Sequence, residues 1–94
     1  MHWCYVLYSP SMDRFYIGET EDLDLRIHHH NTSFFKNSYT SVASDWVLFV
    51  SLECIDRGHA RKVESFIKRM KSKKFIRSLR DSTKIQAAIT AKFK

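Results

Sequence analysis

Two short apolar runs at the N-terminus constrain the fold of this chain most strongly. Residues 2–8 have the sequence HWCYVLY, an aromatic and β-branched run that predicts a strand buried on both of its faces. Residues 9–13 (SPSMD) have turn chemistry. Residues 14–18 (RFYIG) predict a second strand, whose final Gly18 is expected to be an ordinary turn glycine. Together the two runs predict an antiparallel hairpin.

The register of this hairpin decides which side chains are neighbours. If the hairpin is symmetric about Pro10 and Ser11, then Tyr5 lies directly opposite Tyr16. The Cβ atoms of such a cross-strand pair are about 5 Å apart. We therefore expect the two tyrosines to form a facing pair.

The next segment predicts one helix and one strand. Thr20 is a good helix N-cap and is followed by several acids, so we expect a helix over residues 21–30. Residues 32–45 form a polar loop that is rich in Ser and Thr. Residues 46–52 (WVLFVSL) then predict a third strand.

The C-terminal part of the chain predicts two helices. Apolar residues at helical spacing follow Gly58 and predict a helix over residues 60–71. A shorter helix is expected over residues 73–80. Residues 83–94 are either helical or a frayed tail, and the pattern does not decide between these two.

These elements follow the order β-β-α-β-α-α. A hairpin followed by one later strand favours a small, mostly antiparallel three-stranded sheet flanked by helices, an α/β fold of the α+β type. A chain of 94 residues holds one modest core, so we expect a single domain over residues 1–94. No apolar run approaches the roughly 20 residues that cross a bilayer, and no secretory leader is evident. We expect no membrane partner and a cytoplasmic location, with association with the nucleoid also open.

Two cysteines lie far apart in the sequence, and both fall in or near predicted strands. Cys4 and Cys54 have neither a CxxC arrangement nor another spacing of metal ligands. We therefore expect both to be buried, reduced thiols.

Charge is divided unevenly along the chain, whose net charge is +6. Residues 1–56 contain three Lys or Arg and eight Asp or Glu, whereas residues 57–94 contain thirteen Lys or Arg and two acids. A basic half on a small domain is typical of a protein that binds a polyanion such as nucleic acid. Charge alone explains a solubilising surface equally well.

Glu64 is the one acid among ten basic residues between Arg57 and Arg80. An ion pair with Lys68, four residues later on the same helix, accounts for its presence. A lone carboxylate among cations also suits a hard divalent cation that bridges protein and phosphate. Mg²⁺ typically takes one or two carboxylates together with waters and substrate oxygens. Both explanations stay open on spacing alone.

Four further side chains are candidates for chemistry. Arg26 and His30 share one face of the first predicted helix. Arg26 either pairs with Asp22 or binds phosphate oxygens through its guanidinium group. Taken singly, Tyr5 and Tyr16 are better explained as packing residues of strands. The order and spacing of all these residues along the chain strengthen a functional explanation for them.

Together these residues resemble the GIY-YIG nuclease superfamily in its short stand-alone branch, and they are similar to the N-terminal nuclease domain of the excision-repair incision subunit. The resemblance covers about residues 3–76 and includes D-W-V-L at 45–48 before the third strand. Four further motifs carry it: W-C-Y ending at Tyr5, Y-I-G beginning at Tyr16, R-x-x-x-H-N beginning at Arg26, and A-x-x-x-E-x-x-x-K running from Ala60 through Glu64 to Lys68.

The resemblance implies a compact domain that hydrolyses DNA phosphodiester bonds with one Mg²⁺ or Mn²⁺ ion. By residue-wise carry-over, Glu64 holds the metal and Arg26 stabilises the charge of the transition state. Tyr5 and Tyr16 orient or deprotonate the attacking water, and His30 assists by proton transfer or hydrogen bonding. Which of these groups is the general base is left open.

Basic residues near these motifs are expected to bind the nucleic acid: Lys36, Lys68, Lys71, Lys73 and Lys74. The first motif is W-C-Y instead of G-I-Y, so only its tyrosine is retained. Glu19 follows Y-I-G at a position where relatives often carry an aromatic or basic residue. An acid there either repels phosphate or adds a contact to the metal.

The sequence therefore predicts a metal-dependent DNA endonuclease with a role in repair, restriction or recombination. The alternative is a catalytically silent nucleic-acid-binding module of the same fold. A pure binding module has no need of an acid at position 64, which favours the enzyme. The oligomeric state, a targeting subunit and the structure of the DNA substrate are open.

Overall fold

The computed structural model describes residues 1–32 and 43–94. Its sheet has three strands in the order β2-β1-β3, and β1 pairs with each neighbour in antiparallel fashion. This confirms the predicted sheet and the α+β fold, with one helix more than the predicted order. The elements are β1 (His2–Ser9), β2 (Arg14–Thr20), α1 (Leu23–Asn31), β3 (Val47–Cys54), α2 (Arg57–Met70), α3 (Lys73–Asp81) and α4 (Thr83–Lys92).

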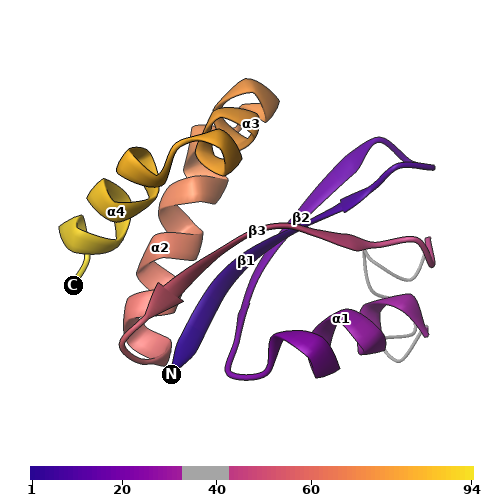
Figure 1. Ribbon diagram of the computed structural model, residues 1–94, viewed down its shortest axis with the longest axis horizontal. Coiled ribbons are helices and arrows are strands. Elements are labelled where there is room, and N and C mark those ends of the chain that lie inside the picture. The colour runs from indigo at the N-terminus through magenta and orange to yellow at the C-terminus, as the bar shows by residue number, and fades with distance from the viewer. Residues whose placement is uncertain (33–42) are drawn as a thin grey trace.

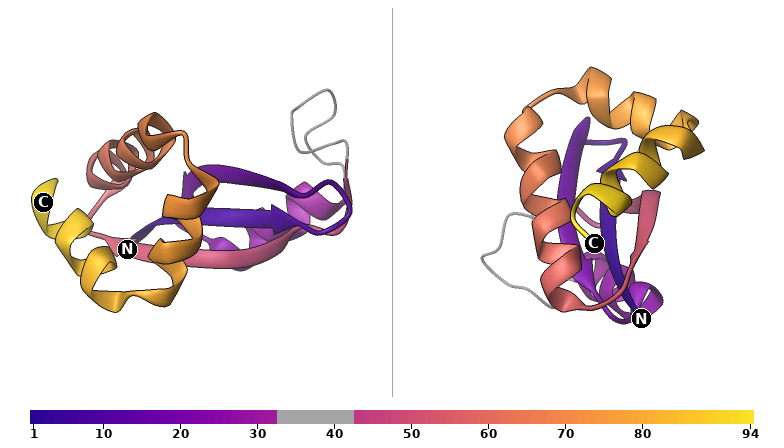
Figure 2. Two further views of the ribbon diagram at one scale, coloured as in Figure 1. Left: turned by 90° about the horizontal axis from the view of Figure 1, so that it is seen from above. Right: turned by 90° about the vertical axis from the view of Figure 1, so that its left-hand side faces the viewer.

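The sheet lies between two unequal layers of helices (Figures 1 and 2). Cys4 and Val6 of β1 point toward α2, α3 and α4 and belong to the larger core cluster. Tyr5 and Leu7, which alternate with them, point toward α1 and pack in a smaller cluster with Trp46. These four residues of β1 are at most 1% exposed, which confirms that the first strand is buried on both faces.

The hairpin register differs from the predicted one by two residues. Tyr5 lies opposite Gly18, and Tyr16 lies opposite Leu7. The prediction that Tyr5 faces Tyr16 directly is therefore wrong, because the turn is centred one residue later than assumed and Ser9 pairs with Arg14. A shift of two residues keeps both tyrosines on the same face of the sheet.

Helix α1 begins later than predicted, because β2 continues to Thr20. Thr20 pairs with Trp3 in the sheet, and its Oγ1 accepts a hydrogen bond from the backbone N of Asp22 at 3.1 Å. The helix N-cap is Asp22, whose carboxylate accepts from the backbone N of Leu25 at 3.1 Å. The predicted cap at Thr20 was wrong by two residues.

The second half of the chain forms three helices, each with an oxygen-bearing N-cap. Asp56 caps α2, so this helix begins three residues before the predicted start and contains Gly58 in its first turn. Ser72 caps α3 and Ser82 caps α4. Residues 83–92 are therefore helical, which answers the question that the sequence pattern left open.

Helix α4 is joined to the rest of the fold through its buried face and one histidine. Ile89 is buried in the larger core cluster, and Phe93 packs against Phe66 with ring centroids 5.4 Å apart. The Nδ1 atom of His59 accepts a hydrogen bond from the backbone N of Ile55 at 3.0 Å. Its Nε2 atom therefore carries the proton and donates to the carbonyl of Thr90 at 2.8 Å.

One further expectation concerns the two cysteines of the strands. Cys4 and Cys54 are buried free thiols, as predicted, and burial raises the pKa of Cys4 above its usual range. Strand β3 is one edge of the sheet, and its Val47 and Leu48 are about half exposed.

Within the described residues, no helix combines the length and apolarity that crossing a bilayer requires.

Candidate active site at the edge of the sheet

The rings of Tyr5 and Tyr16 lie close together because Gly18, next to both of them, has no side chain. Their ring centroids are 6.3 Å apart on the α1 face of the sheet. The Tyr5 ring passes over Gly18, where an added Cβ atom would lie 2.6 Å from the Tyr5 hydroxyl oxygen and 2.8 Å from Cζ. Gly18 has no positive φ, so it is not the turn glycine that we expected. Its missing side chain makes room for Tyr5.

His30 completes this cluster from helix α1. Its Nε2 atom is 3.0 Å from the Tyr5 hydroxyl oxygen in a buried hydrogen bond. Its ring centroid is 4.9 Å from that of Tyr16. Burial, with a smaller contribution from the positive charge of Arg26, lowers the pKa of His30 to about 4. His30 is therefore neutral near pH 7, and its Nε2 can accept the Tyr5 proton in the hydrogen bond.

Tyr5 is held in its neutral form as well. Burial, followed by the neighbouring Tyr16 and by the carboxylates of Glu64 and Glu19, raises the pKa of Tyr5 above its usual range. The positive charge of Arg26 opposes this shift. Tyr5 is 1% exposed, whereas Tyr16 and Arg26 are partly exposed. The inner pair of the cluster is thus Tyr5 with His30, and its reachable members are Tyr16 and Arg26.

The C-terminal end of α1 is tied to the sheet by Asn31, a role that sequence reasoning missed. Its side-chain amide donates to the carbonyl of Trp46 at 2.8 Å and accepts from the backbone N of Trp46 at 2.7 Å. This pair of bonds fixes the last turn of the helix, which contains His30, to the start of β3. In the sequence, Asn31 is part of the R-x-x-x-H-N motif that begins at Arg26, but the motif does not indicate what Asn31 binds.

Glu64 lies on α2, beyond the other face of the sheet from Tyr5 and His30. Its carboxylate pairs with the ammonium group of Lys68 at 2.6 Å, which confirms the predicted i,i+4 ion pair. The hydrogen bond of the Tyr5 hydroxyl goes to His30, and that of the Glu64 carboxylate goes to Lys68. The charge of Glu64 nevertheless contributes to the pKa shift of Tyr5. Helix α2 packs along the edge strand β2, which carries Tyr16 and Gly18.

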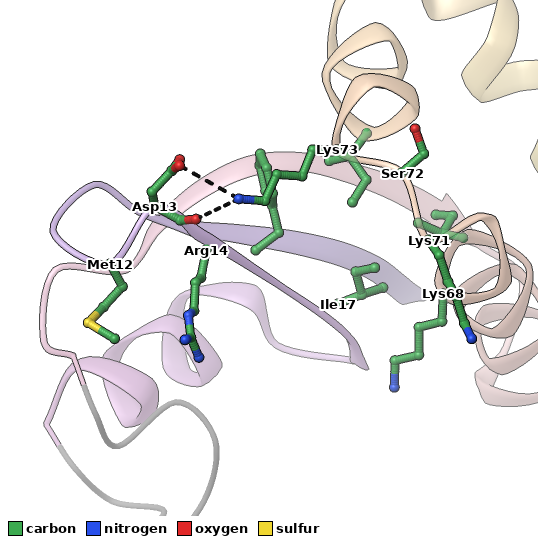
Figure 3. A pocket seen from close by; sticks show the side chains of 11 residues that line it. Met12, Asp13, Arg14, Ile17, Lys68, Lys71, Ser72 and Lys73 are labelled. Atoms are coloured by element: carbon green, nitrogen blue, oxygen red, sulfur yellow. Dashed lines mark hydrogen bonds and ion pairs between the residues drawn. The ribbon is translucent and has the colours of Figure 1, made fainter.

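A basic groove runs between β2 and the end of α2 and has a volume of about 540 Å³. Arg14, Lys68, Lys71 and Lys73 contribute its cations. Figure 3 shows Lys73 reaching toward Asp13 of the hairpin turn, whose carbonyl oxygen accepts a hydrogen bond from Nζ at 3.0 Å. Apolar side chains, among them Ile17 and Ile67, line the groove between these cations.

The predicted nucleic-acid-binding lysines fall into three groups. Lys68 and Lys73 have acidic partners in Glu64 and Asp13. Lys71 and Lys74 are exposed and make no ion pair with another described residue. Lys36 lies outside the described residues.

A second cavity, of about 460 Å³, lies at the other end of β2 and is lined by Arg26, Glu19 and Arg57. One carboxylate oxygen of Glu19 is 2.7 Å from Nε2 of His2, and the other is 3.5 Å from Nε of Arg57. The negative charge of Glu19 is therefore partly balanced by Arg57. Glu64 lies on α2 between Arg57 of this cavity and Lys68 of the basic groove.

Residues 1–77 match the protein family described as GIY-YIG catalytic domain. The chain belongs to the GIY-YIG family. A search of the curated proteins and a search of the solved structures each returned no match. GIY-YIG proteins are generally DNA endonucleases that depend on a divalent metal. The match includes every residue of the tyrosine cluster as well as Glu64 and Lys68.

The residues at this GIY-YIG site are compatible with one oxygen-liganded metal. Among the described residues, no three His, Cys, Asp or Glu side chains gather closely enough to hold an ion by themselves. Glu64 is a carboxylate whose side chain is 19% exposed beside a cationic groove. This donor set suits Mg²⁺ or Mn²⁺, which takes its remaining ligands from water and from phosphate oxygens.

Proposed function

We propose that this protein is a metal-dependent DNA endonuclease that hydrolyses phosphodiester bonds at the edge of its sheet. The observation that supports this most is the buried hydrogen bond between Tyr5 and His30, beside Tyr16. Two hydroxyl groups and a neutral imidazole, with the positive charge of the partly exposed Arg26 acting on them, are suited to handling a water molecule beside a phosphate. DNA repair, restriction or recombination are settings for this activity.

Tyr16 and Arg26 face the substrate in this proposal, because they are the partly exposed members of the cluster. Tyr16 orients the attacking water, and Arg26 stabilises the charge that develops on the phosphate oxygens. Tyr5 and His30 are joined by the hydrogen bond between the Tyr5 oxygen and Nε2 of His30, and their rings pack against Tyr16 and hold it in place. Burial keeps His30 neutral near pH 7, so it can accept the hydrogen bond of the Tyr5 hydroxyl and assist by positioning that group.

Glu64 is the residue that would hold the metal, one Mg²⁺ or Mn²⁺. When bound, such an ion polarises the scissile phosphate and stabilises the leaving oxygen. Lys68 keeps the Glu64 carboxylate in place through its 2.6 Å ion pair. The same lysine lies in the basic groove, where it can contact the phosphate next to the one being cleaved.

The basic groove binds the DNA backbone through Lys68, Lys71 and Lys73, and Lys74 extends this surface on α3. Helix α3 has no acid in its first turn and begins with Lys73 and Lys74. Cations at a helix N-terminus oppose the helix dipole and cost up to about 1 kcal/mol each. This placement is unfavourable for an isolated helix and favourable for a phosphate-binding surface.

The test is plasmid cleavage by the Glu64→Gln variant with Mg²⁺ or Mn²⁺. We expect cleavage to fall at least about 100-fold while binding to DNA is kept or becomes tighter, because one negative charge leaves a cationic surface. Asp81→Asn is the matched control, since it also removes one carboxylate that pairs with a neighbouring cation, Arg80. We expect this control to cleave like the unchanged protein.

The alternative, a binding module without turnover, gives a different result. The unchanged protein would then bind DNA in a salt-sensitive manner and would nick no plasmid with either metal. Cleavage by Glu64→Gln at the unchanged rate would contradict the metal-binding role of Glu64 and leave the nuclease activity standing.

A further inference from the structure

Helix α2 carries a second group of cations on the side that faces away from Glu64. Successive helical residues are rotated by about 100°, so Lys62 and Arg69 lie about 160° and 140° around the helix from Glu64. Arg61 lies about 60° from Glu64 and about 20° from Lys68, so it stands at the border between this side and the groove side. All three of these basic side chains are exposed.

These cations surround a shallow hollow that is separate from the basic groove. Arg61, Lys62, Ser65 and Arg69 line it on α2, and Phe93 lines it from the end of α4, with a volume of about 590 Å³. The small Ser65 lies in the middle of the helical row from Arg61 to Arg69, where it leaves room for a ligand to approach.

Lys92 adds a fourth cation from α4. Its Nζ atom is 4.9 Å from the ring centroid of Phe66 and 5.5 Å from that of Phe93. These cation–π contacts hold the ammonium group next to the hollow. We call Arg61, Lys62, Arg69 and Lys92 the outer face of α2.

The two sides of α2 differ in how their cations are balanced. On the side of α2 that carries Glu64, Lys68 of the basic groove pairs with Glu64, and Arg57 of the second cavity pairs with Glu19. On the outer face, Arg61, Lys62 and Arg69 make no ion pair with another residue in the described part of the chain. Like charges gathered without acids repel one another, and an anionic ligand relieves this repulsion.

We propose that the outer face of α2 is a second binding surface for the DNA phosphate backbone. This inference rests on the proposed function and adds a second contact to it. Arg61 and Arg69 are eight residues apart, about 12 Å along the helix axis. This length spans three to four phosphates of one DNA strand at 3.4 Å each along the duplex axis. A repeating anion therefore fits the row better than a single phosphate group does.

The position of the outer face determines which part of the DNA it contacts. Lys62 and Arg69 point away from Glu64, so a phosphate held at Glu64 and its immediate neighbours do not reach them. The outer face binds a separate segment of the substrate. DNA that extends well beyond the basic groove therefore binds more tightly than a short duplex that only fills the groove.

The test is a binding experiment with two matched double variants in the Glu64→Gln background, without metal. Lys62→Gln with Arg69→Gln removes two cations of the outer face. Lys84→Gln with Lys94→Gln removes two exposed cations from α4 and the chain end, outside the outer face. Thermal unfolding verifies that both variants are folded. Affinity is measured for duplexes of about 10 and about 30 base pairs between about 50 and 200 mM salt.

We expect the outer-face variant to lose up to about 1.8 units of salt slope on the longer duplex, because each lost phosphate contact accounts for about 0.9. On the short duplex both variants bind alike. Equal affinities and slopes for the two variants on the longer duplex would overturn the inference while leaving the nuclease proposal intact. Loss of binding to anionic phosphatidylserine vesicles alone would also overturn it, in favour of a membrane surface. Absence of DNA binding by the parent protein would instead defeat the proposed function.

Discussion

At the scale of single residues, the close passage of Tyr5 over Gly18 makes this glycine the most sensitive backbone position of the site. In Gly18→Ala the new methyl group meets the Tyr5 hydroxyl at 2.6 Å. The Tyr5 ring is buried and bonded to His30, so it has little room to move. We expect the free energy of unfolding to fall by about 1–3 kcal/mol, as for overpacking in a core, in urea denaturation.

Gly58→Ala is the matched control, because the nearest atom to an added Cβ there is 3.5 Å away. Gly58 lies inside α2, where alanine is the better helix former, so stability stays unchanged or rises by up to about 1 kcal/mol. Equal effects of the two substitutions would contradict a packing role for Gly18.

The neutral state of His30 predicts a pH dependence of stability. The pKa of His30 is about 4 in the folded protein and near its ordinary value of 6.5 in the unfolded chain. Its contribution is therefore fully present above pH 6.5 and is lost as the pH falls toward 4, because only the unfolded chain takes up the proton. We expect a loss of about 2–3 kcal/mol between about pH 7 and pH 4.

The His30→Gln variant isolates this contribution in urea denaturation at several pH values. Glutamine can still accept a hydrogen bond from Tyr5 but does not titrate. Protonation of Asp and Glu side chains affects both proteins, so the difference between them reports on His30. Parallel pH profiles of the two proteins would show that His30 titrates normally in the fold.

The motifs were sufficient to select these residues from the sequence but did not give their arrangement. Tyr5, Tyr16 and His30 do come together, which spacing along the chain had predicted only in outline. The role of Gly18 depends on a cross-strand neighbour, and that neighbour follows from the register. Asn31 bonds to the backbone of Trp46, so no pattern of side chains near position 31 reveals its partner.

At the scale of helices and strands, local signals located the elements, and long-range pairing set their ends. Thr20 and Asp22 are both good N-caps, and the sequence does not choose between them. The choice depends on Trp3, which pairs with Thr20 and extends the strand. Helix α4 was undecided because few of its residues are buried, and its position depends on Ile89 and on the His59 bond to Thr90.

The C-terminal end of α2 contains a conflict between stability and binding. Lys71 is the C-cap and adopts a left-handed conformation with φ 48°, where glycine is favoured. We expect Lys71→Gly to raise the free energy of unfolding by up to about 1 kcal/mol. The same change weakens DNA binding, because it removes a cation of the basic groove. Thermal unfolding and DNA titration measure the two effects.

Lys71→Gln separates the two effects, since it removes the charge and keeps a side chain on the left-handed residue. We expect it to weaken DNA binding as much as Lys71→Gly does, with no gain in stability. If Lys71→Gly leaves DNA affinity unchanged, Lys71 is not part of the binding surface.

At the scale of the whole molecule, α4 lies beyond the residues that match the family but belongs to the same core. The match ends at residue 77, whereas Ile89 and Phe93 pack with Phe66 in the larger cluster. We expect a chain that ends at Asp81 to lose at least about 3 kcal/mol of stability, because two large apolar side chains are removed from the core. Urea denaturation of the two chain lengths measures this.

The surface variant Lys84→Gln is the control for α4, because Lys84 is exposed on that helix. We expect its stability to stay within about 0.5 kcal/mol of the unchanged protein. A shortened chain with the stability of the full chain would show that α4 is a separable appendage.

The open edge of β3 has a consequence for how this protein behaves at high concentration. Residues 47–52 carry no charge, and Val47 and Leu48 are about half exposed on this edge strand. Such an edge can pair with the same edge of another molecule. The net charge of +6 keeps molecules apart at low ionic strength. Salt strong enough to strip nucleic acid from the basic surfaces also screens this repulsion, so purification in high salt favours aggregation through β3.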